Sequence, residues 1–418
     1  MDRLHEFIAA HREAASLLIK MAHREKGLPV TIVHHNDADG IAAGAILAHA
    51  FDRMSLKYRL LPVEKVHEQV IGKIHSDSGG IFVYADLGGQ SSDLIGRYAS
   101  VSPLVIILDH HLPGGAVSGN IRHLNVECFG ISGDDDASGA SVCALFAGEL
   151  LKGAPNLSSK DEALPALLGV VGAVGDRQDH KGSLTGINLM LLEAALRLGE
   201  IEKTAKGFTI PRYLNKTVNE IVDLLNLLGS VGFYSGSAGN GVDFLLGTGV
   251  DEAFHIAKQL NELKTSCFKK EAEIIRAQGL PSTQNFQWVD VRDRFVPMGV
   301  KAIGLFLEYL IIEGLVAADK YLIGFQYLPV EMPGIGVLEQ LLTKISARVH
   351  PDLKGAILQQ SLPDFMTLIP QATALVAGTA DGCHRFTAAS LIQQGREVKF
   401  IQALETILAQ ARRDGHRG

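Results

Sequence analysis

The chain reads Val105-Ile106-Ile107-Leu108-Asp109-His110-His111 where an apolar run meets an acid and two imidazoles. Pro103 stands before the run and Pro113 after it, so the apolar residues are typical of one short buried strand. In open α/β sheets, ligands bind just beyond the carboxyl ends of the strands, where these three polar side chains would emerge. By itself the stretch is equally consistent with a turn capped by Asp109 and two surface histidines.

The bulk composition indicates a globular protein of two or three domains. The chain has 418 residues, of which 47% are apolar and 20% charged, and its formal net charge is −7. That charge argues against a broad basic nucleic-acid surface, although it leaves room for a local basic groove. We expect no transmembrane helix, because no apolar run reaches about 18 residues. Four widely spaced cysteines and a charged start without a signal-peptide core lead us to expect a cytoplasmic protein.

A second predicted strand also ends in side chains that can bind metals. Residues 30–33 are typical of a buried strand, and the chain continues as His35-x-Asp37-x-Asp39-Gly40 into a helix-like segment. Side chains two residues apart in extended backbone point the same way, so three ligands could converge just past the strand. Gly40 allows a tight turn into the helix, whose N-terminus favours a bound anion. The alternative is that one of the two acids merely caps the helix.

Two further segments deliver acids to the ends of apolar elements. Asp86 follows the strand predicted at residues 81–85, and Asp176 or Asp179 could enter a site after the buried helix predicted at residues 164–174. Carboxylates and imidazoles without thiolates suit Mn²⁺ or Mg²⁺ better than structural zinc. Six such ligands are too many for one ion with an open position, whereas they fit two ions about 3.5–4 Å apart.

Together these segments resemble the DHH phosphoesterase superfamily. The motifs stand in family order within the first 190 residues, and the run Gly175-Asp176-Arg177-Gln178-Asp179 is similar to one in archaeal RecJ-type members. The resemblance implies that Asp86 bridges two ions, that His111 contacts the scissile phosphate, and that Asp109 orients a neighbouring histidine. It implies six metal ligands: His35, Asp37, Asp39, Asp86, His110 and Asp176.

The middle of the chain has a different sequence pattern. Residues 201–210 are expected to be a connector, residues 252–278 a long amphipathic helix, and residues 229–247, which are rich in glycine and serine, a region that contains loops. We therefore expect an α/β protein of three regions. These are an N-terminal parallel-sheet DHH catalytic domain with flanking helices over residues 1–200, a helical connector over 201–284, and a smaller C-terminal α/β domain over 285–418.

The C-terminal region returns to strand patterns at residues 286–289, 321–325 and 342–349. Residues 378–389 are similar to the glycine-rich, histidine-containing motif of the DHHA1 domain, although Asp381 and Cys383 interrupt the glycines, and we expect them to lead into a helix. The alternative for the His384-Arg385 pair is a surface position at the start of that helix. The resemblance implies that this region binds substrate through Arg348, Gly382, His384 and Arg385.

The motifs predict an enzyme: a RecJ-like, metal-dependent phosphodiesterase that hydrolyses single-stranded DNA, RNA or short oligonucleotides. One alternative is a small-molecule phosphohydrolase for pyrophosphate, polyphosphate or a cyclic dinucleotide, which the acidic net charge favours. Another is a non-catalytic scaffold for replication or repair proteins, which loss of ligands would mark, whereas every ligand position is filled here. We expect two Mn²⁺ or Mg²⁺ ions as cofactors, replication or repair proteins as further partners, and no membrane association.

Overall fold

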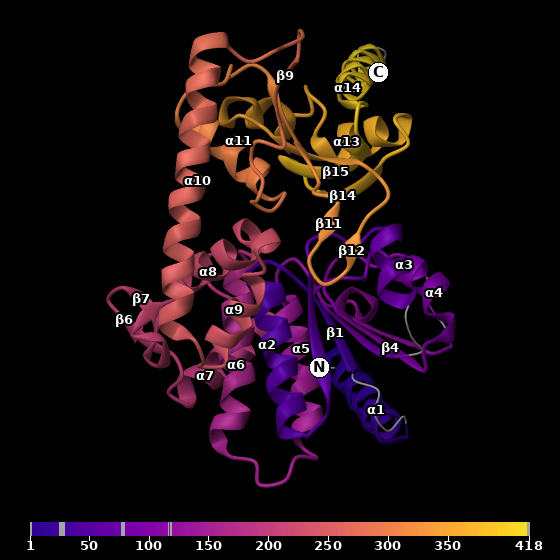
Figure 1. The fold of residues 1–418 in the computed structure, drawn as a ribbon, viewed down its shortest axis with the longest axis vertical. Coiled ribbons are helices and arrows are strands. Elements are labelled where there is room, and N and C mark those ends of the chain that lie inside the picture. The colour runs from indigo at the N-terminus through magenta and orange to yellow at the C-terminus, as the bar shows by residue number, and fades with distance from the viewer. Residues whose placement is uncertain (1, 25–29, 77–79, 116, 118, 416–418) are drawn as a thin grey trace. The chain divides into compact units, whose positions relative to one another are not determined.

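The computed structural model describes residues 2–24, 30–76, 80–115, 117 and 119–415, and it shows a mixed α/β protein, as predicted (Figure 1). The chain divides into two compact units, Met1–Lys258 with Pro333–Ile335 and Gln259–Met332 with Gly336–Gly418. The boundary falls inside the segment predicted as a separate connector, and the three functional regions stay a prediction. Among the described residues, none of the helices combines the length and the apolarity that a membrane span requires.

The first unit is built on a five-stranded parallel sheet with the strand order β2-β1-β3-β4-β5. Its strands are β1 (Val30–His35), β2 (Tyr58–Val63), β3 (Ile81–Ala85), β4 (Leu104–Asp109) and β5 (Ile121–Asn125). Ala85 of β3 lies opposite His34 of β1 and Leu108 of β4. Because these three strands run parallel and in register, the residue that follows each strand lies at the same end of the sheet, where the strands have their carboxyl ends.

Helices cover the sheet, and α2 is central among them. The helices up to residue 197 are α1 (Asp2–Arg24), α2 (Ala38–Arg53), α3 (Glu68–Ser76), α4 (Ser92–Tyr98), α5 (Gly139–Leu151), α6 (Ser159–Gly175) and α7 (Gly186–Arg197). Helix α2 is buried along most of its length and packs against α5 and α6 (Figure 1). Its many alanine and glycine residues let neighbouring helices approach closely. This packing brings one end of α5 and one end of α6 to the first turn of α2.

The remainder of the first unit corrects one prediction. Residues 201–210 are not a plain connector, because they contribute two strands to a small antiparallel sheet: β6 (Glu202–Thr204) and β7 (Gly207–Ile210), followed by β8 (Lys216–Thr217). Residues 229–247 contain turns between short helices, and most of them are helical. There Gly229 and Gly241 are contact points, since a Cβ at Gly229 would overlap the carbonyl of Asn36 and one at Gly241 would crowd Ile41. Glycine therefore serves close packing in this segment.

The short helices and the later helices of the chain complete the list. Up to residue 278 they are η1 (Ala99–Val101), η2 (Val126–Phe129), η3 (Pro211–Tyr213), α8 (Val218–Asn226), the π-helix η4 (Leu227–Val231), η5 (Phe233–Ser235), α9 (Ala238–Leu245) and α10 (Val250–Gln278). After residue 278 they are α11 (Ala302–Ile312), η6 (Pro351–Leu353), α12 (Lys354–Leu358), α13 (Phe365–Leu375) and α14 (Glu397–Gly415). Helix α10 is the long amphipathic helix that the sequence predicts.

The second unit contains a five-stranded mixed sheet with the order β14-β15-β13-β10-β9. Its strands are β9 (Phe286–Arg292), β10 (Tyr321–Tyr327), β13 (Leu342–Arg348), β14 (Thr379–Cys383) and β15 (Thr387–Gln393), and β11 (Glu331–Met332) pairs separately with β12 (Gly336–Val337). The prediction that residues 378–389 lead into a helix is wrong, because they form the β14–β15 hairpin. All seven residues of β15 pair with β13, and this pairing outweighs the helix preference of Ala388 and Ala389.

Candidate metal centre

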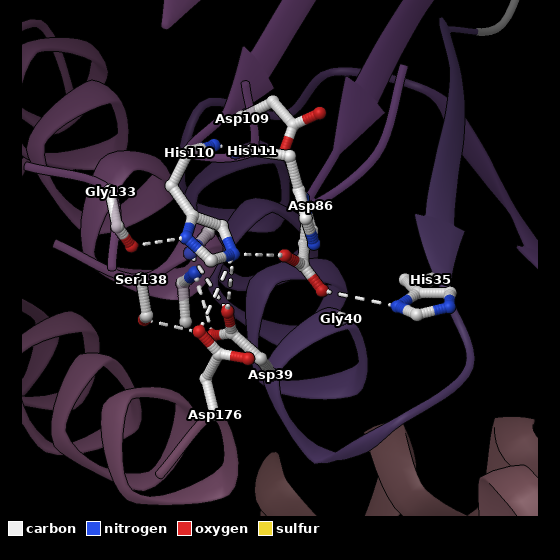
Figure 2. A network of polar contacts seen from close by, with 12 residues as sticks. His35, Asp39, Gly40, Asp86, Asp109, His110, His111, Gly133, Ser138 and Asp176 are labelled. Carbon is white, nitrogen blue, oxygen red and sulfur yellow. Dashed lines mark hydrogen bonds and ion pairs between the residues drawn. The ribbon is translucent and has the colours of Figure 1, made fainter. Parts of the chain in front are cut away.

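The predicted ligands of the first unit converge at the carboxyl ends of the strands of its sheet (Figure 2). His35 is the last residue of β1, Asp86 follows β3, and His110 follows β4. Asp39 lies in the first turn of α2, and Asp176 is the residue that ends α6. The sequence offers Asp176 and Asp179 as candidates, and it is the carboxylate of Asp176 that lies beside Asp39 and His110. Parallel strand ends and two packed helices together bring these segments to one place.

The carboxylate of Asp86 lies between two histidines. Its Oδ1 atom is 3.4 Å from Nε2 of His110, and its Oδ2 atom is 3.5 Å from Nδ1 of His35. Burial raises the pKa of Asp86 well above its usual value, and the nearby carboxylate of Asp39 raises it further. The backbone of Asp86 is left-handed, with φ of 60°, a conformation uncommon outside glycine that is found at functional sites.

A backbone carbonyl sets the orientation of His110. The Nδ1 atom of His110 lies 2.7 Å from the carbonyl oxygen of Gly133 and donates to it, so Nε2 faces the carboxylates. Nε2 lies 3.6 Å from Oδ2 of Asp176 and 3.9 Å from Oδ2 of Asp39. Burial opposes protonation of His110, but Asp176 and Asp86 together raise its pKa well above the usual value. This ring is arranged as a metal ligand, with Nε2 directed at acids and Nδ1 held from behind.

The carboxylate of Asp39 is bound by the N-terminus of α5. Its Oδ1 atom accepts from the hydroxyl of Ser138 and the N–H of Ala140, both at 2.9 Å, and its Oδ2 atom accepts from the N–H of Gly139 at 2.8 Å. The start of a helix is a favourable place for negative charge. Burial nevertheless raises the pKa of Asp39 to about 6, although His110 opposes the shift. A cation in the site would favour the charged form of this acid.

The site residues form overlapping groups that could hold cations. In two groups of three, the donor atoms of His35, Asp37 and Asp86 lie within 4.8 Å of one another, and so do those of Asp39, His110 and Asp176. A further group joins Asp86 and His110 to Asp109 and His111. Among the described residues, Oδ1 of Asp86 and Nε2 of His110 are buried without a hydrogen-bond partner. Both atoms could therefore bind a metal ion without breaking a hydrogen bond. Donors of this kind, oxygen and imidazole nitrogen without thiolate, suit Mn²⁺ or Mg²⁺.

Asp109 and His111 form a hydrogen-bonded pair at the end of β4. Oδ1 of Asp109 accepts from Nδ1 of His111 at 2.8 Å, and Oδ2 accepts from the N–H of Gly89 at 2.6 Å. Burial alone would raise the pKa of Asp109, but the imidazole of His111 and the Gly89 N–H lower it below the usual value. Asp109 is buried, whereas 44% of the His111 side chain is exposed. This is the contact that the predicted orienting role of Asp109 requires, and both roles stay predictions.

The C-terminal candidates belong to the second unit. Arg348, on β13, has its Nε atom 3.0 Å from Oε1 of Glu308, so its charge is already paired. Gly382 lies in β14, and His384 and Arg385 lie exposed in the turn between β14 and β15. The surface position expected for this pair is therefore in a hairpin turn rather than at a helix start. The binding roles of these four residues stay predictions.

Sequence reasoning missed the residues that hold the ligands in place. Ser138 caps α5, and its hydroxyl also donates to Asp39. Gln178 and Asn188 are fully buried amides beside the site and were not singled out as functional. An amide or hydroxyl side chain has no diagnostic spacing, so only the run Asp176-Arg177-Gln178 could have drawn attention to Gln178.

Comparisons with known proteins agree with this architecture. Residues 29–170 match the family model described as the DHH family, N-terminal domain. A protein of Methanocaldococcus jannaschii is 31% identical over 173 residues, which span 40% of this chain and only 36% of that relative's length. The chain therefore spans only about a third of that relative's length.

Solved structures show the same fold over most of the chain. The structure of exonuclease RecJ bound to manganese has a TM-score of 0.60 at 17% identity and covers 96% of this chain and 94% of that chain. RecJ of Thermus thermophilus in complex with Mn²⁺ has a TM-score of 0.63 at 18% identity and covers 96% of this chain and 55% of that chain. CDC45 of Entamoeba histolytica has a TM-score of 0.51 at 13% identity and covers 95% and 99%. The chain is therefore similar to the DHH family over residues 29–170, and its fold is RecJ-like.

Proposed function

We propose that this protein is a metal-dependent phosphodiesterase that hydrolyses single-stranded nucleic acid or short oligonucleotides, as a RecJ-like exonuclease. The observation that carries the proposal is the position of Asp86, whose two carboxylate oxygens face His110 on one side and His35 on the other. A carboxylate with each oxygen directed at a different ligand group is suited to bridge two cations. Figure 2 shows this arrangement.

The ligands divide between the two proposed ions according to the two groups. His35 and Asp37 would hold one ion, and Asp39, His110 and Asp176 would hold the other, with Asp86 shared. Two bound divalent cations supply an activated water at neutral pH and offset charge on the phosphate oxygens. We propose Mn²⁺ or Mg²⁺, because oxygen and imidazole donors prefer these ions.

His111 is our candidate for the contact to the scissile phosphate. Its Nδ1 atom is held by Asp109, so its Nε2 atom lies on the exposed side of the ring. A phosphate oxygen of the substrate would contact the ring at Nε2, on the side away from Asp109. In the second unit, His384 and Arg385 are exposed, although Nε of Arg385 lies 3.8 Å from Oδ2 of Asp364. Arg348 would have to leave Glu308 before it could contact a phosphate.

Single-stranded nucleic acid is the proposed substrate because RecJ exonucleases share the fold over most of this chain. Replication or repair proteins are the proposed further partners, since CDC45 shares the fold as well. The net charge of −7 favours the alternative of a small substrate such as pyrophosphate, polyphosphate or a cyclic dinucleotide. The substrate class is therefore the point that the experiment has to separate.

The test is a substrate panel with purified protein and Mn²⁺. End-labelled single-stranded DNA and RNA, a dinucleotide, a cyclic dinucleotide, pyrophosphate and tripolyphosphate are incubated with the wild type and with Asp86→Asn. We expect the wild type to release mononucleotides from a single strand and Asp86→Asn to release none. Turnover of the small phosphates alone would replace the nuclease proposal with the small-molecule alternative. A protein that binds Mn²⁺ but hydrolyses nothing on the panel would be the scaffold.

A further inference from the structure

We propose that Gln178 and Asn188 are positioning residues that hold three predicted ligands, Asp39, His110 and Asp176, in place for one cation. The inference rests on the proposed function, because it concerns the metal centre on which that function depends. Both amides are buried, with exposed fractions of 2% for Gln178 and 0% for Asn188. Buried amides normally have their hydrogen bonds satisfied, so the identity of their partners shows what they hold.

Gln178 connects two of the three ligands. Its Nε2 atom donates to Oδ2 of Asp176 at 2.9 Å and to the carbonyl oxygen of Gly133 at 2.8 Å. The same Gly133 carbonyl accepts from Nδ1 of His110 at 2.7 Å. One backbone oxygen therefore fixes both the imidazole and the amide, and the amide in turn holds the carboxylate. Loss of the Gln178 side chain would remove the hydrogen bond to Asp176. It would also leave His110 as the remaining side chain of this pair that is hydrogen-bonded to the Gly133 carbonyl.

Asp176 needs such a donor because of its place on α6. It is the residue that ends the helix, where the unpaired backbone carbonyls carry partial negative charge. A carboxylate is unfavourable at that end of a helix, in contrast to the carboxylate of Asp39, which is bound by the N–H groups at the start of α5. About a third of the Asp176 side chain is exposed, so burial alone does not hold it. The donation from Gln178 supplies a fixed orientation toward His110.

Asn188 sets which way the Gln178 amide points. Nδ2 of Asn188 donates to Oε1 of Gln178 at 2.5 Å, so Nε2 of Gln178 must face Asp176 and Gly133. The Asn188 amide is itself oriented, because its Oδ1 atom accepts from the N–H of Ser138 at 3.1 Å and from the hydroxyl of Ser141 at 2.6 Å.

The chain of hydrogen bonds closes at the third ligand. The hydroxyl of Ser138 donates to Oδ1 of Asp39 at 2.9 Å, and the backbone N–H of Ser138 holds Asn188. Ser138 therefore connects the Asn188 amide to the Asp39 carboxylate, and Gln178 connects the same amide to Asp176. Hydrogen-bonded groups that orient metal ligands typically change metal affinity by about 10- to 100-fold when they are removed.

The experiment measures Mn²⁺ affinity by electron paramagnetic resonance of the free ion, with the full-length protein. Gln178→Met keeps the length of the side chain and removes its hydrogen bonds, and we expect it to weaken the tightest Mn²⁺ site by at least about tenfold. Asn188→Ala should weaken it similarly, although the side-chain hydrogen bonds of Asn188 within the described part of the chain go to Ser138, Ser141, Asp135 and Gln178. Because both act through one network, the double variant should bind no more than about twofold more weakly than the worse single variant.

Gln287→Met is the matched control. Gln287 is also a buried glutamine, with 3% exposure, but it donates to the carbonyl of Ala317 at 2.7 Å and accepts from the Ala317 N–H at 2.9 Å, in the second unit. It should lose thermal stability without any change in Mn²⁺ affinity. This comparison separates a role at the metal centre from the general cost of removing a buried amide.

The outcomes separate the two proposals. Mn²⁺ affinity within twofold of the wild type in both Gln178→Met and Asn188→Ala, or an equal loss in Gln287→Met, would overturn the positioning role and leave the proposed function intact. A wild type that binds Mn²⁺ and shows the expected losses but hydrolyses nothing would support the positioning role and overturn the enzyme. A wild type that binds no Mn²⁺ or Mg²⁺ would overturn both.

Discussion

Nε2 of His110 lies 3.4 Å from Oδ1 of Asp86, and neither atom has a hydrogen-bond partner within the described part of the chain. A buried polar atom left without a partner typically costs about 1–3 kcal/mol of stability. The imidazole nitrogen also faces two more carboxylates, those of Asp39 at 3.9 Å and Asp176 at 3.6 Å. A divalent cation would satisfy all four groups at once, which is why we propose this arrangement as a metal site.

Removal of the shared carboxylate should separate catalysis from stability. Asp86→Asn keeps the side-chain shape and removes the bridging charge, so hydrolysis should fall by more than about a hundredfold. The metal-free variant should melt at or above the wild-type temperature, because burial already disfavours the charge on Asp86 and raises its pKa. Mn²⁺ at 100 times its dissociation constant should stabilise the wild type by about 2.7 kcal/mol and the variant by much less. Thermal melts with and without Mn²⁺ measure this, and an unchanged Mn²⁺ response would contradict the bridging role.

His111→Ala should impair turnover without loss of metal. The ring is half exposed and its Nδ1 atom is held by Asp109, although both residues also form a potential ligand group with Asp86 and His110. Because the proposed role of His111 is a contact to the phosphate, we expect kcat to fall by about a hundredfold or more at an unchanged Mn²⁺ affinity. His180→Ala is the control, because His180 is an equally exposed histidine paired with an acid, Asp135, at 3.5 Å. Steady-state kinetics on the best substrate of the panel give the result. Equal activity of His111→Ala and the wild type would remove His111 from the mechanism.

A methyl group at Gly172 should damage the site through packing. The Cβ of Gly172→Ala would overlap Oδ1 of Asp39 and the Cβ of Ala140, so we expect a loss of about 1–3 kcal/mol in unfolding free energy and weaker Mn²⁺ binding. Gly148→Ala is the control, because Gly148 is exposed on α5 with open space around its Cβ position. That control should gain up to about 1 kcal/mol, since alanine favours the helix. Urea titrations of both variants test the pair, and a neutral Gly172→Ala would mean that Asp39 can move aside.

A buried histidine of α1, which is not one of the predicted ligands, should make the protein sensitive to acid. Burial lowers the pKa of His11 from 6.5 to about 4, although the carbonyl of Phe7 opposes the shift. Above pH 6.5 the ring is neutral in both states and has no effect. Between about pH 6.5 and 4, His11 is protonated in the unfolded chain but not in the folded protein. The free energy of unfolding therefore decreases as the pH is lowered through this range, by up to about 1.4 kcal/mol per pH unit.

His11→Gln should remove that one-proton contribution from the slope of unfolding free energy against pH. His23→Gln is the control, because His23 lies on the same helix and its Nδ1 atom also contacts the carbonyl four residues earlier, at 2.7 Å, but its ring is exposed. Solvent already surrounds His23 in the folded protein, so its replacement should leave the slope nearly unchanged. Equal slopes for His11→Gln and the wild type would show that His11 takes up its proton without unfolding.

The central strands of the first unit could be predicted, and the edge strands could not. β3 and β4 are continuous apolar runs because both faces of a central parallel strand are buried. β2 and β5 lie at the edges of the sheet and are only partly buried, so their residues carry no such signal. The β14–β15 hairpin was mistaken for the start of a helix for a related reason, since its strand conformation comes from pairing with β13.

The sequence by itself determined that four motifs of acids and histidines follow apolar elements, because hydrophobic runs and ligand spacing are local properties of the chain. Only the tertiary structure decided that the two oxygens of Asp86 face different histidines, and that Gln178 and Asn188 connect Asp39, His110 and Asp176. These relations join residues far apart along the chain. They exist only once parallel strands are in register and α2 is packed against α5 and α6.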